Sequence, residues 1–145
     1  LMRRVSIAVA VAAGALMMCV GAVAASKTQY TSGTRGKAPY VLLTVSGGKV
    51  TTVQWWVKED CGYTDHGTTQ LNVRIKRNGR FNGTDNHSVP GWLGGSSWGQ
   101  HIWGRLSGTT ATVTVDDYSS GQSQSVCDGQ HTFHATDAAL DDGRG

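Results

Sequence analysis

The chain has 145 residues, of which 16% are charged, with 13 Lys and Arg against 10 Asp and Glu. This length suits one domain with tails and excludes two domains. The low charge argues against wholesale disorder, and a single Glu among many Thr, Ser and Gly disfavours a helical bundle.

Residues 1–25 have the features of a secretory signal peptide. Arg3 and Arg4 precede an uncharged apolar run that ends in a small-x-small cleavage sequence. We therefore expect cleavage after Ala24 or Ala25 and a secreted protein, extracellular or periplasmic. The alternatives are a membrane anchor made of the uncleaved segment and a lipid attached to Cys19.

The lead-in and the first hairpin come next. Residues 26–38 are polar and basic, and we expect a flexible lead-in to a folded domain at 39–135. An apolar run at Tyr40–Val45 is followed by a Ser-Gly-Gly-Lys turn and by Val50–Lys58, in which Val53, Trp55 and Val57 share one face. This pattern predicts a β-hairpin.

The middle of the chain predicts a second hairpin. A polar loop at Glu59–Thr68 precedes the strand Thr69–Arg77, in which Leu71, Val73 and Ile75 share one face. The following Asn-Gly pair is the strongest short hairpin signal, and Arg80–Asn82 begins the partner strand.

The last third is predicted as a loop, three strands and a tail. Gly83–Gly95 is the loop, and Ser97–Leu106, Thr109–Tyr118 and Val126–Ala135 are the strands. Residues 136–145 form a short acidic tail.

About seven strands separated by turns predict an all-β, single-domain antiparallel β-sandwich, of jelly-roll or immunoglobulin-like type. The alternative is a small closed β-barrel. The side chains expected to face the core are Val41, Leu43, Val45, Val53, Trp55, Val57, Leu71, Val73, Ile75, Phe81, Ile102, Leu106, Val113, Val115 and Phe133.

The cysteines predict one disulfide. Cys19 leaves with the signal peptide, so Cys61 and Cys127 remain in an exported chain, where two cysteines are typical of one disulfide bond. A structural zinc site is the alternative, but no C-x-x-C pair is present.

Several short segments resemble one class of protein. They are Cys61, Asn78–Gly83, Gly104–Gly108, Cys127–Gly129 and Phe133–Ala135, and the run from Cys61 to Ala135 covers most of the mature chain. Their pattern resembles small exported bacterial β-rich proteins. The resemblance implies the disulfide and the sandwich, and it carries over no catalytic residue and no substrate.

No constellation predicts catalysis, a metal or a cofactor. The sequence around Ser97 matches G-x-S-x-G, but a strand pattern follows it where a hydrolase needs a helix. The neighbours Glu59-Asp60 and Asp116-Asp117 point to opposite faces of a strand, so neither is a ready acid/base pair, and pairing over long range is invisible in sequence. A metal at Asp65-His66 with Asp85–His87 has no supporting ligand spacing.

The tryptophans indicate a ligand site. Trp55 and Trp98 are expected in the core, whereas Trp56 and Trp103 fall on the solvent side and Trp92 in a Gly-rich loop. Exposed flat rings beside polar side chains suit a sugar. The predicted ligand-binding residues are Trp56, Trp92, Trp103, Gln54 and His101. The alternative is structural: a covering element, or Arg74, Lys76 and Arg105 stacking on Trp103.

The sequence thus favours a secreted, non-catalytic binding module, with a glycan or other cell-surface ligand. After loss of 25 residues and two of the 13 basic groups the charge balance is 11 − 10 = +1, so we expect no nucleic-acid partner and no membrane partner. The alternatives are an exported inhibitor or protein-interaction domain using the Gly83–Gly95 loop, and a small hydrolase.

Overall fold

The computed structural model describes residues 26–59, 62–88, 90–93, 95–120 and 129–139. The predicted signal peptide and both predicted disulfide cysteines lie outside these residues. The described chain is all-β, with eight strands and one short 3₁₀ helix: β1 Lys27–Ser32, β2 Tyr40–Ser46, β3 Lys49–Lys58, β4 Thr64–Arg74, β5 Arg80–Ser88, η1 Gly91–Leu93, β6 Ser97–Ser107, β7 Thr110–Ser120 and β8 Gln130–Asp137. Among these residues there is no helix with the length and apolar character needed to cross a membrane.

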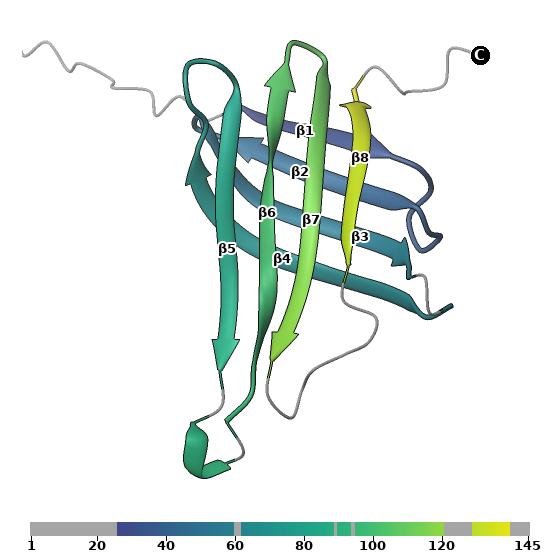
Figure 1. Cartoon of the computed structure of the whole chain (residues 1–145). Helices are drawn as coiled ribbons and strands as arrows, with labels where there is room; N and C mark the ends of the chain where they lie inside the picture. The colour runs from purple at the N-terminus through teal and green to yellow at the C-terminus, as the bar shows by residue number, and fades with distance from the viewer. Residues whose placement is uncertain (1–25, 60–61, 89, 94, 121–128, 140–145) are drawn as a thin grey trace, which may run out of the picture.

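The strands form one antiparallel sheet in the order β4-β3-β2-β1-β8-β7-β6-β5. Figure 1 shows β1–β4 crossing steeply behind β5–β8, so the two halves of the sheet face each other. The edge strands β4 and β5 also contact each other. The sheet is therefore continuous and nearly closed into a barrel, whereas the expected sandwich would consist of two separate sheets.

Strand β1 joins the two halves. It pairs along its whole length with β2 and, at Tyr30↔Asp137 and Thr31↔Thr136, with β8. The expectation of a flexible lead-in at 26–38 was wrong for this segment. The reason is that β1 is held mainly by backbone pairing and has only one buried side chain, Tyr30, whose hydroxyl donates to the Gly108 carbonyl at 3.1 Å.

The core confirms the predicted inward face. Each of the 15 side chains expected inside is buried or packs against the buried cluster. Val50 was missed, because strict alternation from Val53 places it outside. A β-bulge between Val50 and Thr52, opposite Asn72 with its positive φ of 52°, shifts the register and turns Val50 inward.

Two segments expected to be loops are strands. Strand β4 begins at Thr64 within the expected loop Glu59–Thr68, and β5 continues to Ser88 within the expected loop Gly83–Gly95. Their inward positions carry polar residues or Gly, so they lack the apolar alternation that marks a strand. These positions are Asp65, Gly67, Thr69, Gly83, Asp85 and His87.

Gly67 illustrates how tightly the interior is packed at the border between its apolar and polar parts. It is the register partner of Trp55, which is 2% exposed. A Cβ at residue 67 would lie 2.3 Å from the Trp55 indole, closer than atoms can approach without a shift. The position therefore needs Gly because the indole lies directly over the backbone.

We expect Gly67→Ala to destabilise the protein by about 1–3 kcal/mol, because the indole must leave its packed position. The control is Gly91→Ala, where a Cβ meets nothing within 4 Å. Urea unfolding followed by Trp fluorescence measures both variants. Equal stability of the two variants would contradict the packing described here.

Candidate functional site

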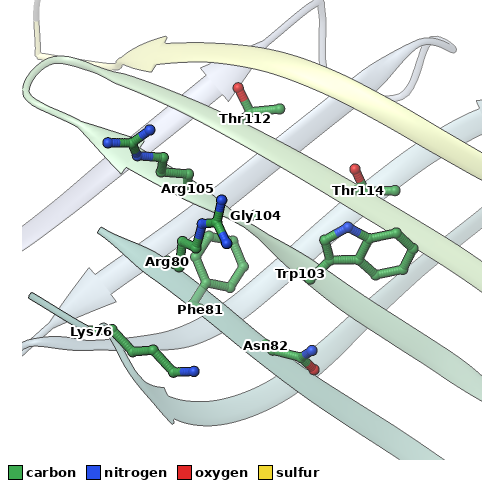
Figure 2. A pocket seen from close by; sticks show the side chains of 9 residues that line it. All are labelled: Lys76, Arg80, Phe81, Asn82, Trp103, Gly104, Arg105, Thr112 and Thr114. Atoms are coloured by element: carbon green, nitrogen blue, oxygen red, sulfur yellow. The ribbon is translucent and has the colours of Figure 1, made fainter. Parts of the chain in front are cut away.

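The first candidate site is a groove of about 620 Å³ on the outer face of β5, β6 and β7. Two rows of register partners cross it. One row is Asn82, Trp103 and Thr114, and the other is Arg80, Arg105 and Thr112. Figure 2 shows the Trp103 indole beside Thr114, with Arg80, Arg105 and Lys76 to one side of it.

The charges of this groove are all positive. Arg80 and Arg105 are exposed and lie directly opposite each other on β5 and β6, and Lys76 lines the same groove. Like charges directly opposite each other in a sheet are destabilising. The ion pairs between described residues involve only His87 and His131, so none of these three cations is neutralised by a described carboxylate.

Polar groups fix the aromatic part of the groove. The rings of His101 and Trp103 have centroids 4.5 Å apart, and His101 Nε2 lies 2.9 Å from Asn82 Oδ1. Arg105 Nε donates to the Asn78 carbonyl at 3.1 Å, which orients its guanidinium at the end of the groove. No described cation stacks on Trp103, so the described residues do not show the cation–π contact that the structural alternative expected.

The other predicted ligand residues lie elsewhere. Gln54 and Trp56 are on β3, which is separated from β6 by four strands of the sheet order. Gln54 Nε2 donates to Thr68 Oγ1 at 3.2 Å, and Trp56 is half-buried between Tyr40 and His66. Trp92, in η1, is 83% exposed. The structure thus brings Trp103 and His101 together, apart from the other three residues.

Trp98 corrects the prediction of a core residue. It is on the inward face of β6 but is 38% exposed, and it stacks on His87 at a centroid distance of 5.8 Å. Its position near the start of β6 places it at the polar end of the barrel. By contrast, Trp55 is buried as expected.

This polar end of the interior is the second candidate site. Carboxylate oxygens of Glu59, Asp65 and Asp117 lie within 4.8 Å of one another. Glu59 follows β3 and is 5% exposed, Asp65 is on β4, and Asp117 comes from β7 across the barrel. The strands thus gather three acids that are far apart in sequence.

The neighbouring polar contacts hold two of these acids. His131 Nε2 lies 3.0 Å and 3.1 Å from the two Glu59 oxygens, and the Trp55 indole Nε1 donates to Asp65 Oδ2 at 3.5 Å. Asp117 differs, because both of its oxygens are buried and neither makes a hydrogen bond of standard geometry, although the Gln100 amide lies close enough to lower its pKa. Asp117 is therefore the least satisfied polar group of the cluster.

The environment of Asp117 raises its pKa to about 6. Burial is the main cause, since it penalises the charged form. The Gln100 amide, from the register partner of Asp117, lowers the pKa, the charges of Asp65 and Glu59 raise it, and His131 lowers it. A buried acid with a shifted pKa beside other acids is typical of functional sites.

Sequence reasoning missed this cluster. It treated Glu59-Asp60 and Asp116-Asp117 as neighbours on opposite faces, and it left pairing over long range open. The inward member Asp117 meets Glu59 only because β7 faces the end of β3 across the barrel. The one usable signal was parity, since Val113, Val115 and Asp117 share one face of β7.

The G-x-S-x-G match has no hydrolase geometry around it. Ser97 begins strand β6, so a strand follows it where the nucleophile elbow requires a helix. Comparisons of the chain with family models, with curated proteins and with solved structures gave no match.

The pKa of Asp117 predicts how stability depends on pH. Its folded pKa, about 6, is above the usual aspartate pKa of 3.8, so its contribution favours folding at low pH and is lost as the pH rises through 6. When partial solvent screening is included, the free energy of unfolding should fall by on the order of 1–2 kcal/mol between pH 4 and 7.5.

The measurement is urea unfolding of wild type and Asp117→Asn across this pH range in EDTA. We expect the variant to gain stability relative to wild type as the pH rises. Asp116→Asn, which removes the same charge from the outer face of β7, serves as control and should follow wild type. A stability difference between Asp117→Asn and wild type that does not change with pH would contradict the assignment.

Proposed function

We propose that the protein is an exported, non-catalytic binding module whose groove around Trp103 takes an acidic glycan. The observation that carries this proposal is the opposition of Arg80 and Arg105 beside the indole, with Lys76 in the same groove and no described carboxylate to neutralise them. An arrangement that costs stability in the free protein indicates a bound anion that offsets the cost.

The groove has the parts that an acidic sugar needs. The Trp103 indole offers a flat apolar surface to a pyranose ring, and Asn82 and Thr114 flank it with hydrogen-bonding groups. Guanidinium groups bind carboxylate or sulfate oxygens through paired hydrogen bonds. The signal-like residues 1–25 and the resemblance to small exported proteins support an extracellular site of action.

A second candidate function is protein interaction through the segment after β5. Trp92 is 83% exposed in the short helix η1, and an exposed aromatic anchor is typical of interface hot spots. This candidate corresponds to the exported inhibitor expected as an alternative. The groove is favoured over it because the groove combines an aromatic ring, cations and a concave shape.

The glycan proposal predicts loss of binding in Trp103→Ala. Affinity electrophoresis in gels that contain polygalacturonate should show a dissociation constant at least about tenfold weaker than that of wild type. Trp56→Ala is the matched control, because Trp56 is half-buried on the outer face of β3, away from the groove. Salt should weaken wild-type binding, since cations of the groove hold the anion.

Equal retardation by polygalacturonate and by a neutral glucan would contradict the acidic ligand. Equal loss of binding in Trp56→Ala and Trp103→Ala would contradict the groove as the site.

We also propose that Cys61 and Cys127 form a disulfide. The residues beside them support this pairing. The Glu59 carboxylate contacts His131, and a Cβ on Gly129 would lie 3.0 Å from Glu59 Oε2, so the chain two residues before Cys61 lies against the chain two residues after Cys127. The backbone around Glu59 also turns tightly, with the Gly62 amide donating to the Glu59 carbonyl at 2.8 Å.

We expect the mature protein to be about 2 Da lighter before reduction than after it, because the bond removes two hydrogens. Reduction should destabilise the fold by about 4 kcal/mol, the entropy cost of a long open loop. Mass spectrometry without reductant, followed by urea unfolding with and without reductant, measures both effects. Two alkylatable thiols in the native protein would contradict the bond.

A further inference from the structure

We infer that the groove around Trp103 takes a glycan in which a sugar with a sulfate or phosphate ester adjoins an uncharged sugar. This inference rests on the proposed function, because it specifies which acidic glycan the groove binds. Two observations on the outer face of the sheet carry it. Several cations lie on one side of the Trp103 indole, and a carboxylate lies on the other side.

The cationic side of the groove offers donors from three side chains. Arg80 and Arg105 are register partners, and the Cβ atoms of such a pair lie about 4.5–5.5 Å apart, so both side chains can reach one anion. Arg105 donates through Nε to the Asn78 carbonyl, which leaves its two terminal nitrogens for a ligand. Lys76 adds an ammonium group to the same side of the indole, as Figure 2 shows.

A tetrahedral ester fits these donors better than a carboxylate does. A carboxylate has one edge of two oxygens, and this edge pairs with one guanidinium fork. A sulfate or phosphate ester has three terminal oxygens and therefore three such edges, so two guanidinium forks and an ammonium group can bind it together. The opposed pair Arg80 and Arg105 thus favours an ester over the carboxylate of a uronic acid.

The opposite side of the indole carries a negative charge. Asp116 is half-buried on the outer face of β7, opposite His101 and one row beyond the row of Trp103 and Thr114. Four residues of a strand span about 13 Å, so the row of Asp116 is about that far along the strands from the row of Arg105. No ion pair between described residues neutralises Asp116.

This carboxylate selects against a second anion on the ligand. Asp116 repels a carboxylate or an ester, whereas it can accept hydrogen bonds from the hydroxyl groups of an uncharged sugar. The Trp103 indole lies between the two charged sides, beside Thr114, which is only 5% exposed although it is on the outer face. A glycan that crosses the indole therefore meets cations at one end and a carboxylate at the other.

Titration of the full chain with single sugars, followed by NMR of the Trp103 indole N–H, tests the preference for an ester. Galactose 6-sulfate, galactose 6-phosphate and galacturonate place a sulfate, a phosphate and a carboxylate on the same carbon of the same ring, and galactose is the uncharged control. We expect at least one ester to have a dissociation constant at least about fivefold below that of galacturonate. The tighter ester identifies the group of the natural ligand. Trp103→Phe identifies the signal.

The variant Arg80→Lys tests the guanidinium fork, because it keeps the charge and removes the planar pair of donors. Its preference for the tighter ester over galacturonate should fall below about twofold. The matched control is Arg35→Lys. Arg35 is exposed in the segment between β1 and β2, in the other half of the sheet, so this variant should keep the wild-type preference.

The variant Asp116→Asn tests the selection against a second anion. Polygalacturonate carries a carboxylate on every sugar, so affinity electrophoresis should show at least about threefold tighter binding of the variant than of wild type. Binding of the tighter ester of galactose, which has a single charged group, should change by less than about twofold.

The results that overturn this inference differ from those that overturn the proposed function. Galacturonate that binds as tightly as both esters, equal loss of the preference in Arg80→Lys and Arg35→Lys, or unchanged affinity of Asp116→Asn for polygalacturonate would each overturn the inference alone. Charged sugars that all bind no more tightly than galactose would contradict the acidic glycan itself.

Discussion

The short pairing of β1 with β8 is the contact on which the rest of the structure depends. Two register pairs, Tyr30↔Asp137 and Thr31↔Thr136, join β1 to β8 in the described chain, while β1 is fully paired with β2. Without this joint, β1–β4 and β5–β8 would be two sheets with open edges. With it, they form one wall around a single interior, and the residues of β3 and β7 face each other across that interior.

The interior is divided along the axis of the strands. One end is filled by aliphatic and aromatic side chains such as Leu43, Ile102 and Val113, each fully buried. The other end holds Glu59 and Asp117 with their polar neighbours. Burial of the apolar end supplies the hydrophobic stabilisation. This stabilisation offsets the unfavourable burial of the acids at the polar end.

This division explains which parts of the fold the sequence predicted. Where the interior is apolar, all 15 side chains expected inside are buried or pack against the core, but the expected set lacks Val50, which a bulge turns inward, and Tyr30 on β1. Where the interior is polar, the sequences at the start of β4 and at the end of β5 resembled loops, because Asp65 and Asp85 occupy inward positions. Of these two missed segments, the start of β4 contributes Asp65 to the acidic cluster.

The candidate sites were predictable to different degrees. Parity correctly placed Trp103 and His101 on the outer face, because both lie within a regular strand. It could not separate them from Trp56 and Gln54, because the alternation of apolar and polar residues along a strand does not determine the order of strands in the sheet. The meeting of Glu59 with Asp117 was invisible for the same reason, since it depends on the closure of the sheet.

Nuclear Overhauser contacts between β1 and β8 test the closed sheet most directly. The account predicts backbone contacts from Tyr30 and Thr31 to Thr136 and Asp137, together with a slowly exchanging Ala138 amide, which donates to the Gln29 carbonyl at 2.7 Å. Contacts from β1 to β2 alone, with rapid exchange at Ala138, would contradict it.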